Sequence, residues 1–576
     1  MLDAAPHRGR KVRLHTEGRC SLGVASAEDL DDASIAAENG AALAVCGTID
    51  NLDDIAARSG LRRPLPASPA AIVLAAFREL GDDAANALRG AFSGVFTDGS
   101  SIRAFRDHVG FGVLHYGDQG GNVYVATEAR QVLAGAGSPR MPEPDFLESL
   151  LYDRYDDETL CALKGVRRLP QGSILVAGPN GVRWSRFWRP NELLETARLT
   201  TGEVQARFDE LMTQAIARVL TGRDVIALSG GIESTAIAAY ASPEHRSRWG
   251  RPLAALSAVY PRFPGIDERA PVELVAKELG LELHLFEPQA GPLDGLREWV
   301  QRCGWPAPSS FSQPRELYLA ARGLGYRTIL SGNYGELATD VGQPHLVTHL
   351  VRARRLRALR AFVGAERARG VSRGAIARQL ARASFPSAVA DAYDSRRRQD
   401  SFGPDWLDRT RVARQAPGQV RARGRWRQAQ LASFYIPRLA VEADEIEQAS
   451  TGVQVRWPWA DVDLWEFFLR LPAETKYPDL RPRKLLVRRL LRGKVPDAIL
   501  DRAEKTVYGD AEMRWIDYRL LRELLRHPEE RIAGVDYDRL GRHLEDEDLP
   551  ARDFRYIRNL AAIHIFLEEW PDRTRN

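Results

Sequence analysis

The chain has 576 residues, of which 44% are hydrophobic and 27% are charged. This composition is typical of a globular protein, and the length predicts two or more domains. No apolar run reaches the roughly 18–20 residues that a membrane span needs, and the N-terminus lacks the apolar core of a secretory signal. Four cysteines without a CxxC pair argue against a zinc site or a disulfide framework, so we expect a reducing, cytoplasmic location.

The formal charge of +4 is unevenly distributed. Residues 351–430 hold 20 arginines, no lysine and 6 acidic residues, a charge of +14 that leaves −10 for the rest. Such a segment can bind an acidic peptide or a nucleic acid. The alternative is a solvated helical face, because arginine outnumbers lysine 74 to 7 in the whole chain. Aromatic residues are too sparse here for a nucleic-acid stacking platform, so we expect no nucleic-acid partner.

Up to about residue 190 the pattern predicts short strands between glycine turns, mixed with helices, which is an α+β arrangement. The predicted elements are strands over Leu43–Cys46, Ala91–Phe96 and Asn122–Ala126 and a helix over Ser68–Leu80. A polar stretch at about 190–202 predicts a linker. We therefore expect one domain over residues 1–195 and a second over residues 200–576.

The second domain opens with a predicted amphipathic helix over Glu203–Arg218. Strands then alternate with helices, and the strands are predicted at Val225–Leu228, Leu253–Val259, Leu283–Phe286 and Arg327–Leu330. This alternation implies a parallel α/β sheet with crossover helices. The remainder, including the Arg-rich region 351–430, is predicted to be mainly helical.

The first of these predicted strands ends in a loop suited to phosphate. The loop and the start of the following helix contribute Leu228, Ser229, Gly230, Gly231, Glu233, Ser234 and Thr235. Two glycines let the backbone approach a phosphate closely, while the helix N-terminus and the hydroxyl groups supply donors. No Gly-Lys-Ser/Thr follows, so this is not the phosphate loop of kinases and GTPases.

A second loop, which includes Ser331, Gly332 and Glu336, follows the last predicted strand. Ligands of open α/β sheets bind at the carboxyl ends of the strands, so the two loops can face each other. Glu233 and Glu336 would then hold one Mg²⁺ together with pyrophosphate oxygens. The alternative for Glu336 is that it only caps a following helix.

A third cluster lies near the C-terminus, where Lys484, Lys494 and Lys505 stand among arginines. A compact ammonium can neutralise the charge that develops on a leaving pyrophosphate, so Lys484 and Lys505 are candidate catalytic residues. The alternative is a basic helix surface.

Taken in order, these segments resemble the asparagine synthetase family over nearly the whole chain. Residues 228–234 are similar to its Ser-Gly-Gly-x-Asp-Ser pyrophosphate loop, and residues 331–336 to its Ser-Gly-x-Gly-x-Asp loop. Asp267 and Glu268 match its acidic pair. Residues 452–461 look like its Gly-x-Glu-x-Arg-x-Pro-Phe-x-Asp signature, and residues 484–505 match its Lys-x-x-Leu-Arg run. The resemblance implies an ATP-pyrophosphatase fold that splits ATP into AMP and pyrophosphate to activate a carboxylate.

The N-terminal part resembles the glutamine amidotransferase domain that precedes such synthetases, which implies an Ntn-hydrolase-like αββα sandwich. The similar segments are residues 46–51, 88–92, 98–99, 105–110, 124–128 and 169–172. Those glutaminases use a cysteine exposed as the first residue, with its α-amine as the base. Here Leu2 follows Met1, so we expect a scaffold without glutamine hydrolysis. Cys20 would serve only if everything before it were removed, and we expect instead a buried strand cysteine.

The sequence departs from the family at four positions in these motifs. Both loop aspartates are glutamates, Glu233 and Glu336; Tyr334 replaces a glycine; and Gln454 replaces the glutamate of the signature. One extra methylene per carboxylate moves a bound metal outward, although the paired change could preserve the site. If it does not, adenylation would be weakened or lost.

Loss of the ammonia-producing half favours an amine within the substrate itself as the nucleophile, because a tethered reactant has an entropic advantage. Two branches of the family fit, β-lactam synthetases and lasso peptide cyclases. We favour a cyclase that adenylates an Asp or Glu side chain of a precursor core peptide and closes a macrolactam with its N-terminal amine. An ammonia-dependent asparagine synthetase, another amide-forming enzyme and an inactive partner protein remain as alternatives.

The cyclase hypothesis implies ATP and Mg²⁺ as cofactors, and a precursor peptide, a leader peptidase and a leader-recognition protein as partners. A general base is needed to deprotonate the amine, and the sequence does not assign it; Glu442 and Glu447, near the family's signature, are candidates, and Glu442 is a candidate catalytic residue. Trp457, Trp459 and Trp465 could offer contact area to a peptide, although Trp459 and Trp465 are also typical core residues. The peptide, its ring size and the oligomeric state are not encoded in these motifs.

Overall fold

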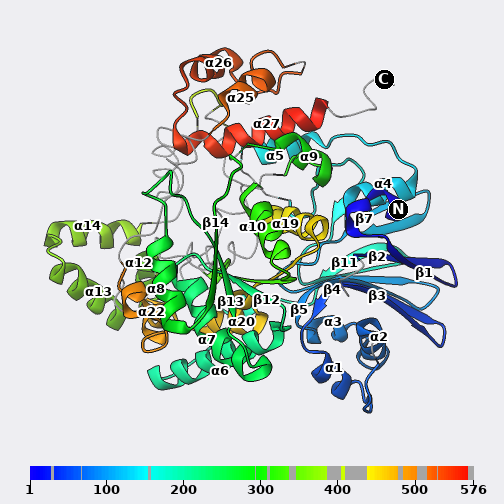
Figure 1. Cartoon of the computed structure of the whole chain (residues 1–576), viewed down its shortest axis with the longest axis horizontal. Coiled ribbons are helices and arrows are strands. Elements are labelled where there is room, and N and C mark those ends of the chain that lie inside the picture. Colours follow the sequence, from blue (N-terminus) through cyan, green and yellow to red (C-terminus); the bar gives the residue numbers. More distant parts are fainter. Residues whose placement is uncertain are drawn as a thin grey trace.

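A computed structural model gives the fold in two domains (Figure 1). It describes residues 1–27, 32–66, 68–152, 157–291, 293–307, 312–335, 346–385, 404–408, 411, 438–477, 484–502, 516–528 and 530–568, and every structural statement below concerns these. The N-terminal domain lies at the right of the figure and the C-terminal domain in its centre and left. None of the described helices is long and apolar enough to cross a membrane.

The N-terminal domain is built on an antiparallel sheet of six strands in the order β11-β10-β6-β5-β4-β3. Its strands are β3 (Ala33–Glu38), β4 (Ala41–Ile49), β5 (Gly90–Thr97), β6 (Ile102–Arg106), β10 (Ser173–Gly178) and β11 (Gly181–Arg186). A second β layer comprises the hairpin β1 (Lys11–Glu17) and β2 (Cys20–Ser26) and the sheet of β7 (His115–Gln119), β8 (Asn122–Ala126) and β9 (Arg167–Arg168). Short 3₁₀ turns, η1 (Leu2–Ala4) and η2 (Pro6–Arg8), precede β1.

Helices cover both outer faces of these β layers. On one side lie α1 (Leu52–Arg58), α2 (Pro69–Leu80) and α3 (Asp83–Ala87), whose apolar residues pack with the alternating inward residues of β4 and β5. On the other side α4 (Ala129–Ala136) packs on β7 and β8. The layers are therefore α, β, β, α, as the sequence predicted.

The C-terminal domain is built on a parallel sheet of five strands in the order β14-β13-β12-β15-β16. The strands are β12 (Asp224–Ala227), β13 (Ala254–Ala258), β14 (Glu282–Phe286), β15 (Thr328–Ser331) and β16 (Gln454–Arg456). The chain runs outward from β12 to β14 and then returns to β15 on the other side of β12. The loops after β12 and β15 are thus adjacent at a topological switch point.

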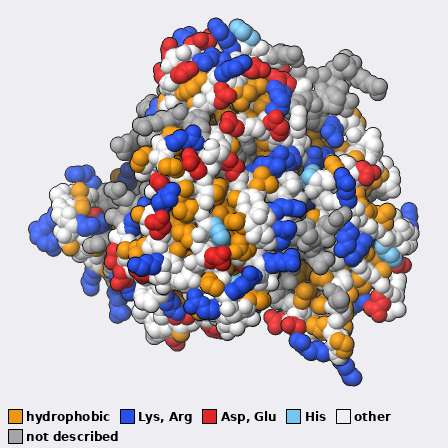
Figure 2. Space-filling model, viewed as in Figure 1, with side chains coloured by type: hydrophobic (Ala, Val, Ile, Leu, Met, Phe, Trp, Pro, Cys, Tyr) orange, Lys and Arg blue, Asp and Glu red, His pale blue; other side chains and the backbone are white. Residues whose placement is uncertain are grey.

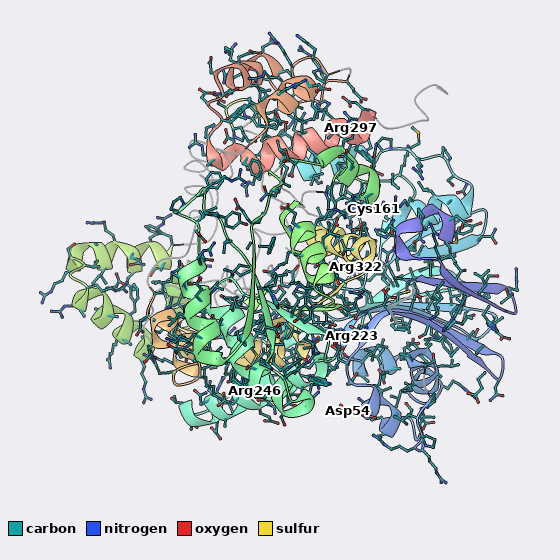
Figure 3. All side chains as sticks on the ribbon, viewed as in Figure 1. Asp54, Cys161, Arg223, Arg246, Arg297 and Arg322 are labelled. Atoms are coloured by element: carbon teal, nitrogen blue, oxygen red, sulfur yellow. The ribbon has the colours of Figure 1, made fainter. Side chains whose placement is uncertain are left out.

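Crossover helices cover this sheet. The strands are connected through α7 (Ile232–Trp249), α8 (Arg269–Leu279) and α10 (Ser312–Gly323), and α6 (Thr201–Val219) precedes β12. α9 (Leu296–Cys303) also lies between β14 and β15 in the chain, but it packs on α27 (Phe554–Glu568). A capping box starts α6, in which Thr200 and Glu203 satisfy each other's backbone N–H groups. α7 contacts α6 and α8, whereas α10 contacts α19 (Arg438–Thr451). Arg322, labelled in Figure 3, lies on α10. It donates to the carbonyl of Thr451 on α19 at 2.5 Å.

Further helices extend the domain in two directions. At the left of Figure 1, α12 (Leu346–Arg352), α13 (Leu356–Ala368) and α14 (Arg373–Ser384) form a projecting arm. At the top lie α25 (Tyr518–Leu525), α26 (Tyr537–Asp546) and α27 (Phe554–Glu568), with α5 (Pro144–Leu151) beneath. The remaining helices are α20 (Val462–Arg470), α21 (Ala473–Lys476), α22 (Leu485–Leu490) and α23 (Asp497–Leu500) and the 3₁₀ turns η3 (Pro190–Glu192), η5 (Pro458–Ala460) and η6 (Ala551–Asp553).

The hydrophobic cores cross the boundary between the two domains. One core joins Phe111 and Trp188 of the first domain to Phe208 and Trp457 of the second. Another joins Leu150 and its neighbours to Leu560 of α27 and to α9. The predicted division at residues 195–200 therefore separates two folds in the sequence but does not separate two independent cores.

Candidate active site

The loop between β12 and α7 has the geometry of an anion site. Gly230 has φ of +66°, a conformation that a side chain would strain. The Ser229 and Ser234 hydroxyls lie 3.1 Å apart, and the Ser229 N–H donates to Ser234 Oγ at 3.2 Å. The first-turn N–H groups of α7 have no partner within the helix and point toward the loop. Ser229 is exposed at this loop, so a phosphate group can approach from solvent.

The loop after β15 packs directly on this helix N-terminus. A Cβ at Gly332 would lie 2.7 Å from the Ser234 backbone nitrogen, and a Cβ at Gly335 would lie 2.6 Å from Cγ of Glu233. Only glycine permits so close an approach at these two positions. Ser331 ends β15, 7% exposed, beside Ala227 of β12. The structure thus brings Gly332 to Ser234 and Gly335 to Glu233, while Ser331 lies beside Ala227, as the strand order requires.

Lys484 reaches the same place from another part of the chain. Its ammonium forms an ion pair with the Glu233 carboxylate, and both side chains are largely buried, at 13% and 16% exposure. Lys484 precedes α22 with φ of +65°, an uncommon conformation for a residue other than glycine. The ion pair places a positive charge beside the predicted phosphate loop, where anionic oxygens would gather.

The signature run, residues 452–461, contains β16 and connects this site to the rest of the protein. Trp459 donates from Nε1 to the Glu233 carbonyl at 3.0 Å. Arg456 pairs with Asp50 of the first domain, and Trp457 stacks on Phe111 with ring centroids 4.1 Å apart. The signature run therefore contacts both the first domain and the start of α7, and so holds the two together.

Two predicted site residues, Glu336 and Lys505, lie outside the described residues. Of the predicted metal pair the structure shows only Glu233, which provides one carboxylate and already binds Lys484. Among the described residues no group of three or more His, Cys, Asp or Glu side chains is placed to hold a metal ion. A divalent cation here would need oxygens from outside this set, such as those of a nucleotide.

Glu442 is not at this loop. It is 5% exposed on α19 and pairs with Arg168 at 2.6 Å and His115 at 3.2 Å, both in the first domain. Although burial opposes ionisation, these two partners lower the pKa of Glu442 to about 2. A carboxylate stabilised in this way is a poor proton acceptor, which argues against the general-base role for which it was a candidate. Glu447 is similarly buried and pairs with Arg302 and Arg315.

Other sequence-based expectations also change. Trp457, Trp459 and Trp465 are all buried, at 8%, 0% and 1% exposure, so none offers a surface to a peptide. Thr235, which we expected to supply a hydroxyl donor at the loop, is fully buried. Lys494 pairs with Asp209 at 2.9 Å and lies over the Tyr240 ring, so it belongs to the contact between α6 and α7.

The four cysteines do not form a nucleophilic site. Burial raises the pKa of Cys46 to about 12 and that of Cys161 to about 11, and it raises that of Cys303 well above its ordinary value. A reactive thiolate needs a lowered pKa. Cys20 begins β2 and is half-buried rather than fully buried as we expected. Removal of everything before Cys20 would delete β1, with which β2 pairs throughout.

Comparison with known proteins places this geometry in a family. Residues 207–570 match the model of asparagine synthase, and residues 1–188 match that of the glutamine amidotransferase domain. The chain belongs to the asparagine synthase family. Members of this family use ATP to form amide bonds, so the protein is an ATP-dependent amide-forming ligase. The loops after β12 and β15 are its candidate nucleotide site.

Two solved structures are similar in part. The glutamine phosphoribosylpyrophosphate amidotransferase from B. subtilis, in complex with ADP and GMP, is 12% identical, with 50% of this chain and 78% of that chain covered and a TM-score of 0.25. A structure titled as the allosteric regulatory enzyme of purine biosynthesis is 15% identical, with coverage of 51% and 77% and the same TM-score of 0.25. At such scores neither bears on the site. A search of curated proteins found no match.

The sequence did not reveal how this site is supported. The contacts of Trp459 with Glu233, of Asp50 with Arg456 and of Arg502 with Glu268 join residues that are hundreds of positions apart. The only available signal was the family signature itself, which marks Arg456 and its neighbours without stating what they touch. Arg502 lies 2.9 Å from Glu268, so one acidic residue of the predicted pair is bound to the C-terminal basic run.

Proposed function

We propose that the protein closes a macrolactam in a lasso precursor core peptide, by adenylating an Asp or Glu side chain and joining it to the N-terminal amine. The observation that carries this proposal is the pairing of the loop after β12 with Lys484 in a member of the asparagine synthase family. It supports activation of a carboxylate by ATP. The peptide substrate, the ring and the AMP-forming route are the parts that we propose.

The reaction balances in two steps. A substrate carboxylate oxygen attacks the α-phosphorus of ATP, the bond to pyrophosphate breaks, and an acyl-adenylate forms. The amine nitrogen then attacks the acyl carbon, the bond to the AMP oxygen breaks, and the amine loses a proton. The products are the cyclic amide, AMP and pyrophosphate, and the peptide has lost the elements of one water.

Each part of the site has a proposed task in this reaction. Residues 228–234 bind the pyrophosphate portion of ATP through backbone N–H groups and the Ser229 and Ser234 hydroxyls. Lys484 neutralises charge on the leaving group, a task that Lys505 would share. Glu233, together with Glu336, is proposed to bind Mg²⁺, which would neutralise further phosphate charge once Lys484 yields part of its contact.

The properties of the first domain favour an attacking amine that belongs to the substrate and is not ammonia released from glutamine. Cys161 is buried and Cys46 is partly buried, and both have raised pKa values, so neither resembles a glutaminase nucleophile. The domain instead provides charged and apolar contacts to the second domain. A leader peptidase and a leader-recognition protein are proposed partners, because the attacking amine must first be freed from the leader.

The test is mass spectrometry of a lasso precursor peptide, to be sought in the genes around this one, incubated with the protein, Mg·ATP and a leader peptidase. The proposal predicts a core peptide that has lost one water and an equal amount of AMP, both strongly reduced by Lys484→Ala or Lys505→Ala. A core that is cleaved but never dehydrated, without AMP, would contradict it. An inactive partner protein is the second candidate, because Glu233 is already occupied by Lys484.

A further inference from the structure

The projecting arm carries an unbalanced positive charge. We define the basic arm as α13, the turn 369–372 and α14, which stand away from the body at the left of Figure 1. Within residues 356–384 the arm holds seven arginines against one glutamate, Glu366. Figure 2 shows Lys and Arg side chains gathered over this part of the surface. So much like charge in one small unit is unfavourable in isolation.

The arginines of the arm are directed outward by helical spacing. On α13, Arg357, Arg360 and Arg367 are exposed on the side opposite to buried Phe362. On α14, Arg378 is exposed opposite to buried Ile376. The exposed positions between these arginines are mostly alanine and glycine, so the guanidinium groups project above a flat helical surface.

Few of these charges are neutralised within the protein. In this part of the chain, Arg369 pairs with Glu366, and Arg355 pairs with Glu474 at 3.0 Å and Glu195 at 3.7 Å. The structure gives no ion-pair partner, among the residues it describes, to a further set of exposed arginines. These are Arg354, Arg357, Arg360, Arg367, Arg373 and Arg378.

The base of the arm is held firmly beside the candidate active site. Glu195, in the linker between the domains, accepts from the Ala473 N–H at 3.2 Å and pairs with His349 at 3.2 Å. A small apolar core joins Phe362 of the arm to Ala473 and Tyr477 of the α21 region. α21 contacts α22, the helix that Lys484 precedes. The base of the arm is therefore linked through α21 to α22, the helix that follows Lys484.

Exposed apolar side chains lie at the base of the arm and not at its tip. Leu356, 67% exposed, begins α13, and Phe385, 52% exposed, follows α14. Arg352 donates to the Phe385 carbonyl at 3.1 Å, which fixes Phe385 near the start of α13. A membrane-binding arm would carry such residues at its tip, where the turn 369–372 is instead mainly polar. A nucleic-acid platform would need exposed aromatics along the arginine rows, and there Phe362 is buried.

We propose that the basic arm docks an acidic, amphipathic segment of the precursor peptide, with its carboxylates on the arginine rows and its apolar side chains at Leu356 and Phe385. This rests on the proposed function for the identity of the peptide, but the docking is a binding property that needs no ATP. Complementary charge increases the association rate, and the apolar contacts at the base set the register.

The test is fluorescence anisotropy of the full-length protein with a labelled synthetic peptide of alternating glutamate and leucine pairs, without nucleotide. The arm variant Arg357→Glu, Arg360→Glu, Arg367→Glu should bind at least about tenfold more weakly, since three exposed charge contacts become repulsive. A second variant, Arg373→Glu with Arg378→Glu, should show the same direction from the other helix. The matched control changes Arg58, Arg62 and Arg183, which are exposed on the first domain, to glutamate and should change the Kd by less than about twofold.

Two further measurements complete the test. Unlabelled precursor peptide should displace the probe, and a probe with lysine in place of glutamate should bind the arm variant better than the wild type. The proposal is overturned if arm and control variants weaken binding equally, if the precursor does not compete, or if duplex DNA or phosphatidylserine vesicles bind the arm more tightly than the peptide. A failure of dehydration with arm-dependent competition intact would contradict the macrolactam proposal alone.

Discussion

At the scale of single residues, Glu233 shows what the longer acidic side chain does. The family that the loop resembles has aspartate at this position; here the Glu233 carboxylate pairs with the Lys484 ammonium, and Trp459 donates to the Glu233 carbonyl. The pair keeps a lysine beside the phosphate loop before any nucleotide binds. A charge fixed in advance costs little reorganisation when a phosphate arrives.

Lys484→Ala should therefore lower the rate of AMP formation by about a hundredfold or more, as expected for loss of a preorganised charge. The affinity for ATP should fall less, because the loop N–H groups remain. Rapid-quench kinetics with a saturating substrate peptide measures both. Lys494→Ala is the control, because Lys494 pairs with Asp209 away from the loop. If the two variants lost the same fraction of the rate of AMP formation, the loss would come from the change in overall charge and not from the position of Lys484.

Glu442 has a structural role, and its titration gives a second prediction. The pKa of Glu442 is lowered from 4.5 to about 2, so its stabilisation is present above the unfolded pKa and is lost as the pH falls through the folded one. Glu442→Gln should cost about 3–5 kcal/mol at neutral pH because Arg168 is left buried without its partner. The variant should also lose this part of the pH dependence. Urea unfolding at neutral and acidic pH checks both, with the exposed Glu210→Gln as control; a variant as stable as the control contradicts the ion-pair account.

At the scale of elements, the site depends on two loops that touch through glycine. Gly332→Ala should separate them, because the new Cβ would lie 2.7 Å from the Ser234 backbone nitrogen. We expect ATP binding to weaken by about tenfold or more, measured by calorimetric titration, since the loss of one charge-assisted contact is worth about 1.5–3 kcal/mol. Gly364→Ala on α13 is the matched control: its Cβ would meet nothing within 4 Å, and helix propensity predicts slightly higher stability. Unchanged binding in Gly332→Ala would mean that the loops need not be in contact.

The sequence predicted elements well where local patterning is strong. The strand at Asn122–Ala126 was placed correctly, and the four strands from β12 to β15 and helix α6 lie within a few residues of their predicted bounds. It did not predict β16, because Gln454–Arg456 is too short to show alternation and joins β15 from more than a hundred residues away. The proximity of the two loops could be predicted because strand order alone determines it. The ion pair of Glu442 with Arg168 could not, because it joins distant parts of the chain and leaves no local pattern.

At the scale of the whole molecule, two sequence domains share their cores. Phe111 stacks on Trp457, Trp188 donates to Glu466 at 3.0 Å, and α27 packs on α5. Arg8 pairs with Glu128 of its own domain and Glu445 of the other. The first domain therefore stabilises the C-terminal domain and the signature run, residues 452–461.

Because of these shared cores, thermal unfolding should follow one cooperative transition for the whole chain. Differential scanning calorimetry should give van't Hoff and calorimetric enthalpies that nearly agree. Phe111→Ala should lower the melting temperature of that single transition, since a buried aromatic contact between the domains is lost. Two separate transitions, with the first domain melting alone, would contradict the shared-core account.

The central claim is that the loops after β12 and β15 activate a substrate carboxylate as its adenylate. The most direct measurement uses a precursor core peptide whose acceptor side-chain carboxylate carries heavy oxygen, incubated with the protein and Mg·ATP. The account predicts that one heavy oxygen is transferred to AMP, because the carboxylate oxygen that attacks the α-phosphorus leaves with AMP when the amide forms. Label found in inorganic phosphate, or an amide formed with unlabelled AMP, would contradict it.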